Sequence, residues 1–590
     1  TGASSDVTIT SLTGSSTAPT GVVLGARTLT LSNASGTYSG VIDGTGGVTL
    51  TAGTETLSGA NTYSGGTTLN GGTLKAGSAT AFGTGTITVS SGAALDLNGQ
   101  TMTSTGGLTL NGTGISSGGA LLNSSATGGT YAGLVTLGSA ASIMGGTGSI
   151  TLSHSGTITG SGFGLTLGGS SGGSIASIIG TGAGTLTKSG TGTWTLSGVN
   201  TYTGDTTISG GTLALSGSGS IATSSGVTTS GSGVFSITGA SSDVTITSLT
   251  GSSTATTGVV LGARTLTLSN ASGTYSGVIG GTGGVTLTAG TETLSGVNTY
   301  TGGSTINGGT LALSGSGSIA SSSGVTTSGS GVFSITGASS DVTITSLTGS
   351  STAPTGVVLG ARTLTLSNAS GTYSGVIDGT GGVTLTAGTE TLSGANTYSG
   401  GTTLNGGTLK AGSATAFGTG TITVSSGAAL DLNGQTMTST GGLTLNGTGI
   451  SSGGALLNSS ATGGTYAGLV TLGSAASIMG GTGSITLSHS GTITGSGFGL
   501  TLGGSSGGSI ASIIGTGAGT LTKSGTGTWT LSGVNTYTGD TTISGGTLAL
   551  SGSGSIATSS GVTTSGSGVF SITGASSDVT ITSLTGSSTA

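Results

Sequence analysis

A long internal repeat constrains this chain more than any other feature. The segment TGASSDVTITSLTGSSTA begins at Thr1, Thr238, Thr336 and Thr573, so its starts are offset by 237, by 98 and by 237 again. Residues 1–255 recur unchanged as residues 336–590. Repetition on this scale is typical of solenoids, in which each unit packs only against its neighbours.

The repeat divides the chain into units of two lengths. We predict a long unit at 1–237, a short unit at 238–335, a second long unit at 336–572 and the start of a fourth at 573–590. We expect these units to form one continuous solenoid, and the whole chain to be a window cut from a longer array.

The short unit corresponds to the long one with an internal stretch deleted. Both junctions fall in one motif, which reads LSGANTYSGGTTLNGGTL at 57–74 and LSGVNTYTGDTTISGGTL at 196–213. The two copies are offset by 139, which equals the difference in length between the two units. A stack of interchangeable coils would tolerate this loss if a whole number of coils were removed. We therefore expect about seven coils in the deleted stretch and about five in the short unit.

Local alternation of apolar residues with Thr or Ser predicts short strands, as in RTLTLSN at 27–33 and GTITVSS at 85–91. Comparable apolar positions recur at Leu31, Leu50, Leu69, Val89 and Leu110, in steps of 19, 19, 20 and 21 along the sequence. We predict an all-β, right-handed parallel β-solenoid with coils of about 20 residues. A β-roll or a stack of antiparallel hairpins remains an alternative.

Composition excludes several other classes of protein. Gly contributes 133 residues and charged residues only 3%, while net charge is −6. Gly and β-branched Thr both disfavour helices. Seven basic residues cannot build a nucleic-acid surface. No apolar run is long enough for a spanning helix, so we expect no membrane-spanning segment in this region. The absence of Cys fits an extracellular chain stabilised by repetition rather than by disulfides.

Opposite charges recur at a spacing close to one predicted coil, which would place them in neighbouring coils. We predict structural inter-coil charge pairs, and their members are Asp6, Arg27, Glu55, Lys75, Asp96, Asp243, Arg264, Asp341, Arg362, Glu390, Lys410 and Asp431. Exposed pairs of this kind stabilise a fold by only about 0–1 kcal/mol each.

Aromatic residues recur in and beside the motif. They are Tyr63, Tyr202, Tyr300, Tyr398, Tyr537, Trp194 and Trp529. We expect each Tyr to cap a corner or pack over a loop. The alternative is a surface role, since exposed aromatic faces on a sheet can stack on sugars.

Catalytic and metal chemistry have few candidate residues. The chain has two histidines, His154 and His489, far in sequence from any acid, and GGSSG at 168–172 matches a nucleophile motif that chance produces in a chain rich in Gly and Ser. Asp43 and Glu55 are the closest acids in the long unit, whereas glycoside hydrolysis needs two carboxylates about 5–10 Å apart. We predict no catalytic site, no cofactor and no metal site. A polysaccharide-degrading enzyme is a minor alternative.

Thr-x-Thr recurs, for example at 8–10, 28–30, 49–51 and 86–88. A flat Thr-x-Thr ladder could order water and bind ice, provided that these residues lie on one face in consecutive coils. Thr is also common on solvent-facing strands, because its branched side chain fits a pleated surface.

The five LSG[A/V]NTY motifs, together with GTLKAGSATAFGTGTITVSSGAALDLNG at 72–99, resemble the passenger-associated repeat of bacterial autotransporters. The resemblance is close around each copy of the motif, and the interiors of the long units, 112–190 and 447–525, share only its general style. It implies a β-helical passenger that is exported across the Gram-negative envelope and displayed at the cell surface. It carries no catalytic residues.

We therefore expect a structural, non-catalytic surface or extracellular fibre that acts in adhesion, reach, or matrix and filament formation. Expected partners are other copies of the chain, associating laterally or end to end, or cell-surface and glycan ligands. An adhesin that binds glycans through a lateral face is the main alternative.

Overall fold

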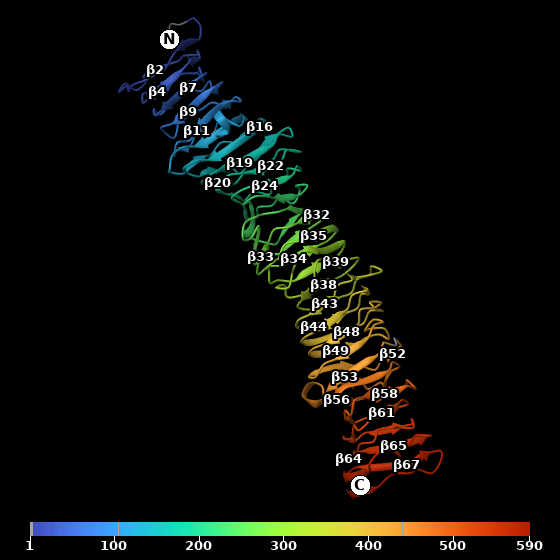
Figure 1. The fold of residues 1–590 in the computed structure, drawn as a ribbon. Coiled ribbons are helices and arrows are strands. Elements are labelled where there is room, and N and C mark those ends of the chain that lie inside the picture. The colour runs from blue at the N-terminus through green and yellow to red at the C-terminus, as the bar shows by residue number, and fades with distance from the viewer. Residues whose placement is uncertain (1–3, 104–105, 439–440, 590) are drawn as a thin grey trace. The chain divides into compact units, whose positions relative to one another are not determined.

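The computed structural model describes residues 4–103, 106–438 and 441–589. It confirms the predicted fold class, because the chain is an all-β parallel solenoid of about 28 turns, each of about 21 residues. Strands of successive coils pair in parallel, as β1 (Val7–Ile9) does with β3 (Leu29–Leu31) and β3 with β6 (Val48–Leu50). The alternative of stacked antiparallel hairpins is therefore wrong. Figure 1 shows the coils of each part following one another along the chain.

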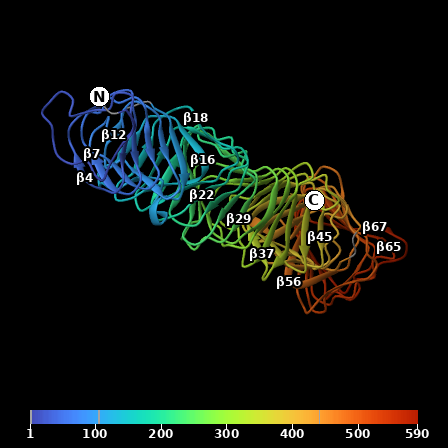
Figure 2. The ribbon, with the colours of Figure 1, turned by 90° about the horizontal axis from the view of Figure 1, so that it is seen from above.

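The chain forms two compact units, Thr1–Gly302 and Gly303–Ala590. Each unit is a stack of coils in its own right. In Figure 2 the strands of successive coils in the first unit, such as β4 (Ala34–Tyr38) and β7 (Gly53–Leu57), follow parallel paths. The boundaries at 237, 335 and 572 that the sequence repeat predicts stay predictions.

In the first unit a coil passes through three faces, and the strands on each face pair into a ladder. Ladder 1 contains β1, β3, β6, β8 (Thr67–Leu69), β10 (Ile87–Val89), β13 (Leu108–Gly112), β16 (Val135–Gly145), β18 (Thr157–Gly160) and β21 (Ile178–Gly180). Ladder 2 contains β4, β7, β9 (Gly72–Ala76), β11 (Ala93–Asp96), β14 (Leu121–Asn123), β16, β19 (Leu165–Gly169), β22 (Leu186–Lys188), β24 (Thr206–Ile208), β26 (Val227–Thr229), β29 (Leu249–Gly251), β32 (Ala271–Tyr275) and β35 (Gly290–Leu294).

Ladder 3 contains β12 (Thr101–Met102), β15 (Gly129–Tyr131), β17 (Ile150–Leu152), β20 (Gly172–Ile175), β23 (Thr193–Leu196), β25 (Thr212–Gly217), β27 (Val234–Ala240), β30 (Val259–Gly262) and β33 (Ile279–Gly281). The remaining elements of this unit are the pair β2 (Val22–Val23) and β5 (Ile42–Asp43), the ladder β28 (Val244–Ile246), β31 (Leu266–Leu268) and β34 (Val285–Leu287), and the short 3-10 turn η1 (Ile115–Ser117).

The second unit repeats this design. One ladder contains β36 (Ser304–Ile306), β38 (Val325–Thr327), β41 (Leu347–Gly349), β44 (Ala369–Tyr373), β47 (Gly388–Leu392), β49 (Gly407–Ala411), β51 (Ala428–Asp431), β54 (Leu456–Asn458), β56 (Val470–Gly480), β59 (Leu500–Gly504), β62 (Leu521–Lys523), β64 (Thr541–Ile543), β66 (Val562–Gly566) and β68 (Leu584–Ser588). Another contains β40 (Val342–Ile344), β43 (Leu364–Leu366), β46 (Val383–Leu385), β48 (Thr402–Leu404), β50 (Ile422–Val424), β53 (Leu443–Gly447), β56, β58 (Thr492–Gly495) and β61 (Ile513–Gly515).

The other strands of the second unit are β37 (Thr310–Gly315), β39 (Val332–Ala338), β42 (Val357–Gly360), β45 (Ile377–Gly379), β52 (Thr436–Met437), β55 (Gly464–Tyr466), β57 (Ile485–Leu487), β60 (Gly507–Ile510), β63 (Thr528–Leu531), β65 (Thr547–Gly552) and β67 (Val569–Ala575), with the 3-10 turn η2 (Ile450–Ser452).

The core is a stack of aliphatic side chains whose register the sequence predicts correctly. Leu31 pairs with Leu50, Leu50 with Leu69, Leu69 with Val89, and Val89 with Leu110. All five side chains are buried. Their spacing in the sequence is therefore the length of a coil, and a thin Leu, Val and Ile core runs along the inside of each stack.

Glycine allows neighbouring coils to approach at the corners. Gly53 begins β7 with φ +82°, in the left-handed region that side chains disfavour. A Cβ atom at Gly53 would also collide with the carbonyl oxygen of Ala34 in the preceding coil. This close approach explains why a solenoid with narrow coils needs so much glycine.

The two versions of the repeated motif lie on different faces. β7 precedes the copy at 57–74 and belongs to ladder 2, whereas its counterpart β23 precedes the copy at 196–213 and belongs to ladder 3. Six successive pairings along ladder 2 lead from β7 to β22, and β23 is the next strand after β22. The two motif copies are therefore separated by six coils and one further face. The expectation of about seven whole coils is wrong, because a single face rather than a whole coil can be exchanged.

Candidate functional site

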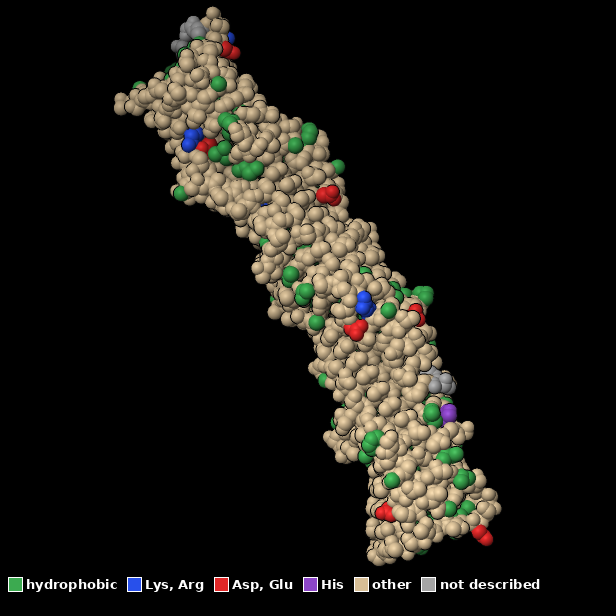
Figure 3. Space-filling model, viewed as in Figure 1, with side chains coloured by type: hydrophobic (Ala, Val, Ile, Leu, Met, Phe, Trp, Pro, Cys, Tyr) green, Lys and Arg blue, Asp and Glu red, His purple; other side chains and the backbone are tan. Residues whose placement is uncertain are grey.

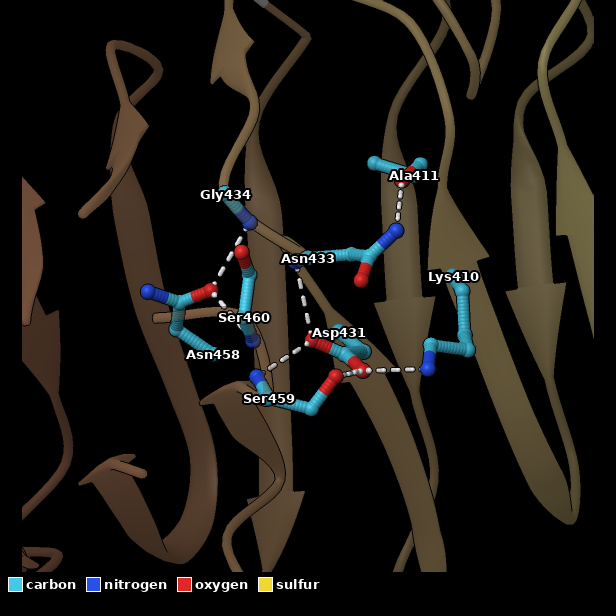
Figure 4. Close-up of polar contacts among 8 residues, drawn as sticks. All are labelled: Lys410, Ala411, Asp431, Asn433, Gly434, Asn458, Ser459 and Ser460. Atoms are coloured by element: carbon cyan, nitrogen blue, oxygen red, sulfur yellow. Dashed lines mark hydrogen bonds and ion pairs between the residues drawn. The ribbon is translucent and has the colours of Figure 1, made fainter. Parts of the chain in front are cut away.

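A polar network around Asp431 links three successive coils (Figure 4). Lys410 in β49 lies opposite Asp431 in β51, and Lys410 Nζ is 3.5 Å from Asp431 Oδ2. The backbone N–H groups of Asn433 and Ser459 each donate to Asp431 Oδ1 at 2.9 Å. The Ser459 hydroxyl donates to Oδ2 at 2.5 Å. Both carboxylate oxygens are thus engaged in contacts that hold the coils together.

Two asparagines extend the network. Asn433 has φ +48°, a left-handed conformation that Asn tolerates, and its Nδ2 donates to the Ala411 carbonyl at 2.9 Å. The backbone N–H of Gly434 donates to Asn458 Oδ1 at 2.8 Å. The same arrangement recurs in the first unit, where Lys75 Nζ is 3.4 Å from Asp96 Oδ2.

The Asp side chain is 2% exposed and the Lys side chain 30%, so the carboxylate is the buried partner. Its oxygens accept from groups fixed in the backbone, which leaves no free carboxylate for acid–base work. The network is a staple between coils rather than a reactive centre.

Three of the predicted charge pairs do not form, and their aspartates accept backbone hydrogen bonds instead. Val7 pairs with Leu29, so Asp6 lies beside Thr28 rather than Arg27. Asp6 Oδ1 accepts the backbone N–H of Thr28 at 2.8 Å. Asp243 and Asp341 accept from Thr265 and Thr363 in the same way. The predicted pairs Asp6–Arg27, Asp243–Arg264 and Asp341–Arg362 are wrong, because the coil at this place is one residue longer than the spacing of the charges.

The predicted pairing of Glu55 with Lys75 is also wrong, as is that of Glu390 with Lys410. Glu55 pairs with Leu74, and Thr56 with Lys75. Alternate residues of a strand point to opposite faces, so Glu55 faces the core while Lys75 faces outward. Glu390 pairs with Leu409 in the equivalent coil.

The aromatic residues of the motif are core residues. All seven have an exposed fraction of 1% or less: Tyr63, Tyr202, Tyr300, Tyr398, Tyr537, Trp194 and Trp529. The Tyr63 hydroxyl lies 2.6 Å from Thr67 Oγ1, and Trp194 Nε1 donates to the Gly168 carbonyl at 2.9 Å. The surface-contact alternative is wrong for these residues. Burial also raises the pKa of Tyr537 to about 12.

The Asn of each NTY segment is a contact that the sequence reasoning missed. Asn61 is 1% exposed. Its Oδ1 accepts from Ile42 N–H at 2.8 Å in one neighbouring coil, and its Nδ2 donates to Ala81 O at 2.6 Å in the other. Asn200, Asn396 and Asn535 also accept a backbone N–H, from Ile179, Ile377 and Ile514. The presence of Asn before Thr-Tyr in all five motif copies was the available signal.

Lys188 is buried where a ladder of apolar residues would predict Leu or Ile. Its register partners are Leu167 and Ile208. Its Nζ donates to the carbonyls of Ser189, Gly190 and Gly210 at 2.7, 3.2 and 2.9 Å. Desolvation lowers the pKa of Lys188 to about 8. Three carbonyls hold the ammonium inside the solenoid wall, so it serves the fold rather than a substrate.

The candidate catalytic residues do not assemble. His154 Nδ1 accepts the backbone N–H of Gly156 at 2.8 Å. In the GGSSG segment, Ser170 and Ser171 donate to the carbonyls of Gly146 and Thr147 at 2.6 and 2.7 Å. Asp43 accepts from Thr62 at 2.6 Å, while Glu55 is buried. Within residues 4–103, 106–438 and 441–589, no group of three His, Asp or Glu could hold a metal ion.

Threonine forms a continuous outer column on ladder 1. One Thr per coil lies in register through eight strands: Thr8, Thr30, Thr49, Thr68, Thr88, Thr109, Thr136 and Thr159. An identical column in the second unit contains Thr343, Thr365, Thr384, Thr403, Thr423, Thr444, Thr471 and Thr494. We call these the Thr columns. They occupy the central position of the three-residue strands and are mostly half-exposed.

The second Thr of the Thr-x-Thr pattern does not form a matching column. The position before each strand holds Thr28, Gly47, Gly66, Thr86 and Gly107 in successive coils. The position after it holds Ser32, Thr51, Asn70, Ser90 and Asn111. The outer face therefore carries one regular file of hydroxyls flanked by mixed residues.

Comparison with known families places the motif. The family model of the passenger-associated transport repeat matches at residues 43–76, 186–215, 289–313, 378–411 and 521–550. These five segments match the passenger repeat of autotransporters. No match was found among curated proteins or among solved structures.

The passenger repeats coincide with structural elements. The match at 43–76 ends with the last residue of β9, and the match at 378–411 ends with the last residue of β49. The match at 186–215 begins with β22 and the match at 521–550 with β62. Each of these repeats thus contains the buried Asn and Tyr of NTY. No helix in the part of the chain that the structure describes has the length and apolar character to cross a membrane.

Proposed function

We propose that this chain is a non-catalytic structural segment of an exported passenger, displayed at the surface of a Gram-negative bacterium, where its stacked coils set reach and present a lateral surface. The proposal rests on one observation: polar side chains that could do chemistry are used inside the fold instead. Asp431, Lys188, Asn61 and Tyr63 are all buried, and the first three bind groups of neighbouring coils. The passenger repeat supports the extracellular assignment.

The surface is poor in features that recognise charged ligands. Figure 3 shows a few acidic and basic side chains, the basic ones beside acidic ones, and scattered apolar ones on a face of uncharged polar side chains and backbone. Net charge is −6 over 590 residues, so copies of the chain repel one another weakly. A long passenger of this kind meets only a low electrostatic barrier when it approaches another copy.

Among the expected partners, we favour a second copy of the chain over a glycan. Sugar binding by stacking needs exposed aromatic rings. All ten Tyr and both Trp are buried, and no Phe is fully exposed. The Thr columns instead offer hydroxyls that both donate and accept, so two identical columns are complementary. The same column occurs in both units of one chain.

Sedimentation velocity across a wide concentration range tests this assignment. We expect reversible association of the full chain, and weaker association when Thr68→Lys and Thr403→Lys place like charges in the Thr columns. The matched control is Thr127→Lys with Thr462→Lys, which adds the same charge at exposed positions outside the columns. A monodisperse chain at high concentration, or equal effects of both double variants, would contradict lateral association through the columns. Binding to a glycan array would favour the adhesin alternative.

Surface display is tested separately on the parent protein. Protease added to intact cells should cleave the passenger, and antibodies against the coils should label unpermeabilised cells. Retention of the segment inside the envelope would contradict the extracellular assignment without affecting the fold.

A further inference from the structure

Three glutamates occupy an inward position of the repeat that tryptophan fills elsewhere. Glu55, Glu292 and Glu390 stand in GTETL segments, and Trp194 and Trp529 stand in the matching GTWTL segments. All five side chains have no exposed surface. The same position of the repeated motif therefore contains either a large apolar ring or a carboxyl group, on different faces of the coil.

Each inward side chain lies opposite a glycine in the preceding coil. Gly273 pairs with Glu292, Gly371 with Glu390, and Gly173 with Trp194. The glycine leaves room beside the core for the long side chain of the next coil. In this setting water does not reach the carboxyl group, and ionisation there is strongly disfavoured.

The carboxyl groups of Glu292 and Glu390 lack compensating partners. Within the described residues, neither oxygen of either group makes a hydrogen bond of good geometry. The hydroxyls of Tyr275 and Tyr373 are likewise buried without a hydrogen bond of good geometry, and the threonines Thr229 and Thr327 are their weak polar contacts. Glu55 differs, because Ser11 Oγ donates to its Oε2 at 3.4 Å.

The titratable groups around Glu390 are few. Tyr373 on the preceding coil is the titratable neighbour on its side of the sheet, the apolar Leu409 lies opposite on the following coil, and the backbone of Leu347 makes a weak favourable contact. Lys410 points to the opposite face and pairs with Asp431. Around Glu292, Tyr275 is the titratable neighbour, and the backbone of Leu249 makes a weak favourable contact. No cation of the described residues faces either carboxyl group closely enough to form an ion pair.

We propose that Glu292 and Glu390 make the local stability of their coils depend on pH. Each coil stays closed while its buried carboxyl group keeps a proton, and it opens locally when that proton passes to solvent. Coils with Trp at the matching position of the motif have no such dependence. The chain thus contains both coils whose stability responds to pH and coils whose stability does not. This inference concerns local opening and does not depend on the proposed surface role.

The direction of the effect follows from the pKa values. Desolvation raises the pKa of Glu292 to about 9 and that of Glu390 to about 8, from an ordinary 4.5. The contribution of the protonated form is complete below pH 4.5 and is lost as pH rises toward these values. Between those limits, the equilibrium constant for opening rises by up to about tenfold per pH unit for each group.

The buried lysines change the stability of the chain in a different pH range. Desolvation lowers the pKa of Lys188 and of Lys523 to about 8. Both are charged in the closed and open states at lower pH, so they add no pH dependence below about pH 7. Measurements between pH 5 and 7 therefore isolate the glutamates.

Hydrogen exchange of the full chain tests the proposal, with uptake corrected for the intrinsic exchange rate at each pH. Peptides around Glu55 and Glu390 have the same sequence, but Gly280 and Val297 make the peptide around Glu292 distinct. We expect its protection to fall by up to about a hundredfold from pH 5 to pH 7. Peptides that contain Trp194 or Trp529 should keep constant protection and serve as the internal control.

The isosteric variant Glu292→Gln removes the titratable carboxyl group but keeps the shape of the side chain. We expect its peptide to show no change in protection over this range, while other peptides behave as in the parent chain. Glu292→Trp, which copies the natural alternative, should behave in the same way. A parent peptide with constant protection, or an equal decline in the parent and in Glu292→Gln, would overturn the proposal.

Discussion

Trp194 lies directly opposite Gly173 in the preceding coil, so the indole ring occupies the space beside a residue with no side chain. A Cβ atom at Gly173 would be 2.9 Å from a ring carbon of Trp194 and closer still to the carbonyl oxygen of Ile150. The pair shows how the solenoid accommodates large residues: glycine in one coil provides the volume for the next.

This relationship predicts that Gly173→Ala destabilises its part of the stack. We expect a loss of about 1–3 kcal/mol through overpacking, observed as earlier melting in a thermal scan followed by Trp fluorescence. The control is Gly107→Ala, where the nearest atom to a Cβ would be 3.9 Å away. Equal melting of the two variants would contradict the packing argument.

The staple around Asp431 predicts unequal effects for its two charged residues. Asp431→Ala leaves two backbone N–H groups and a hydroxyl without their buried acceptor, and we expect a loss of about 2–4 kcal/mol. Lys410→Ala removes a partly exposed partner and should cost less than about 1 kcal/mol. Urea denaturation measures both effects, and high salt should weaken only the contribution of Lys410. A larger effect of the Lys variant would show that the ion pair, rather than the hydrogen bonds, stabilises the coils.

Because the motif fits two different faces of the coil, we predict that the chain still folds when the stretch between two motif copies is deleted. Deletion of residues 57–195 joins Thr56 to Leu196 and recreates the sequence TETLSGVNTY of the short unit. We expect far-UV circular dichroism per residue and the melting temperature to remain close to those of the parent. Deletion of residues 61–195 retains four extra residues and displaces the register, so it should melt earlier. Equal behaviour of the two deletions would contradict the proposed join.

The Thr columns predict an absence of ice binding. A flat Thr-x-Thr surface requires two regular files, but the positions beside the central Thr change from Gly to Thr and Asn between coils. We expect no thermal hysteresis in nanolitre osmometry of the purified chain. A measurable hysteresis that Thr68→Lys abolishes would reinstate that function.

Sequence periodicity predicts the fold because a column of similar residues reveals its own register. The steps from Leu31 to Leu110 match the strand pairings one by one. Single residues are harder to place, because coils vary in length. Lys75 and Asp96 lie opposite each other because their spacing equals the length of their coil. Asp6 and Arg27 have the same spacing in a coil that is one residue longer, so they do not pair.

A slip of one residue also exchanges inside for outside. Glu55 and Lys75 are one residue further apart than the length of their coil, so the carboxyl group lies in the core while the ammonium lies at the surface. The burial of Tyr63 and the two-sided hydrogen bonding of Asn61 depend on how the corner turns, which alternation along a strand does not encode.

The shift of the repeated motif from ladder 2 to ladder 3 has a consequence for how such a passenger changes through recombination. Exchange between the two motif copies removes six coils and one further face. It therefore changes both the number of coils and the face on which each later strand lies. The strands that follow the junction are therefore shifted by one face of the coil. Genetic variation in repeat number would therefore change the face of the coil on which later surfaces lie, while every coil keeps its own packing.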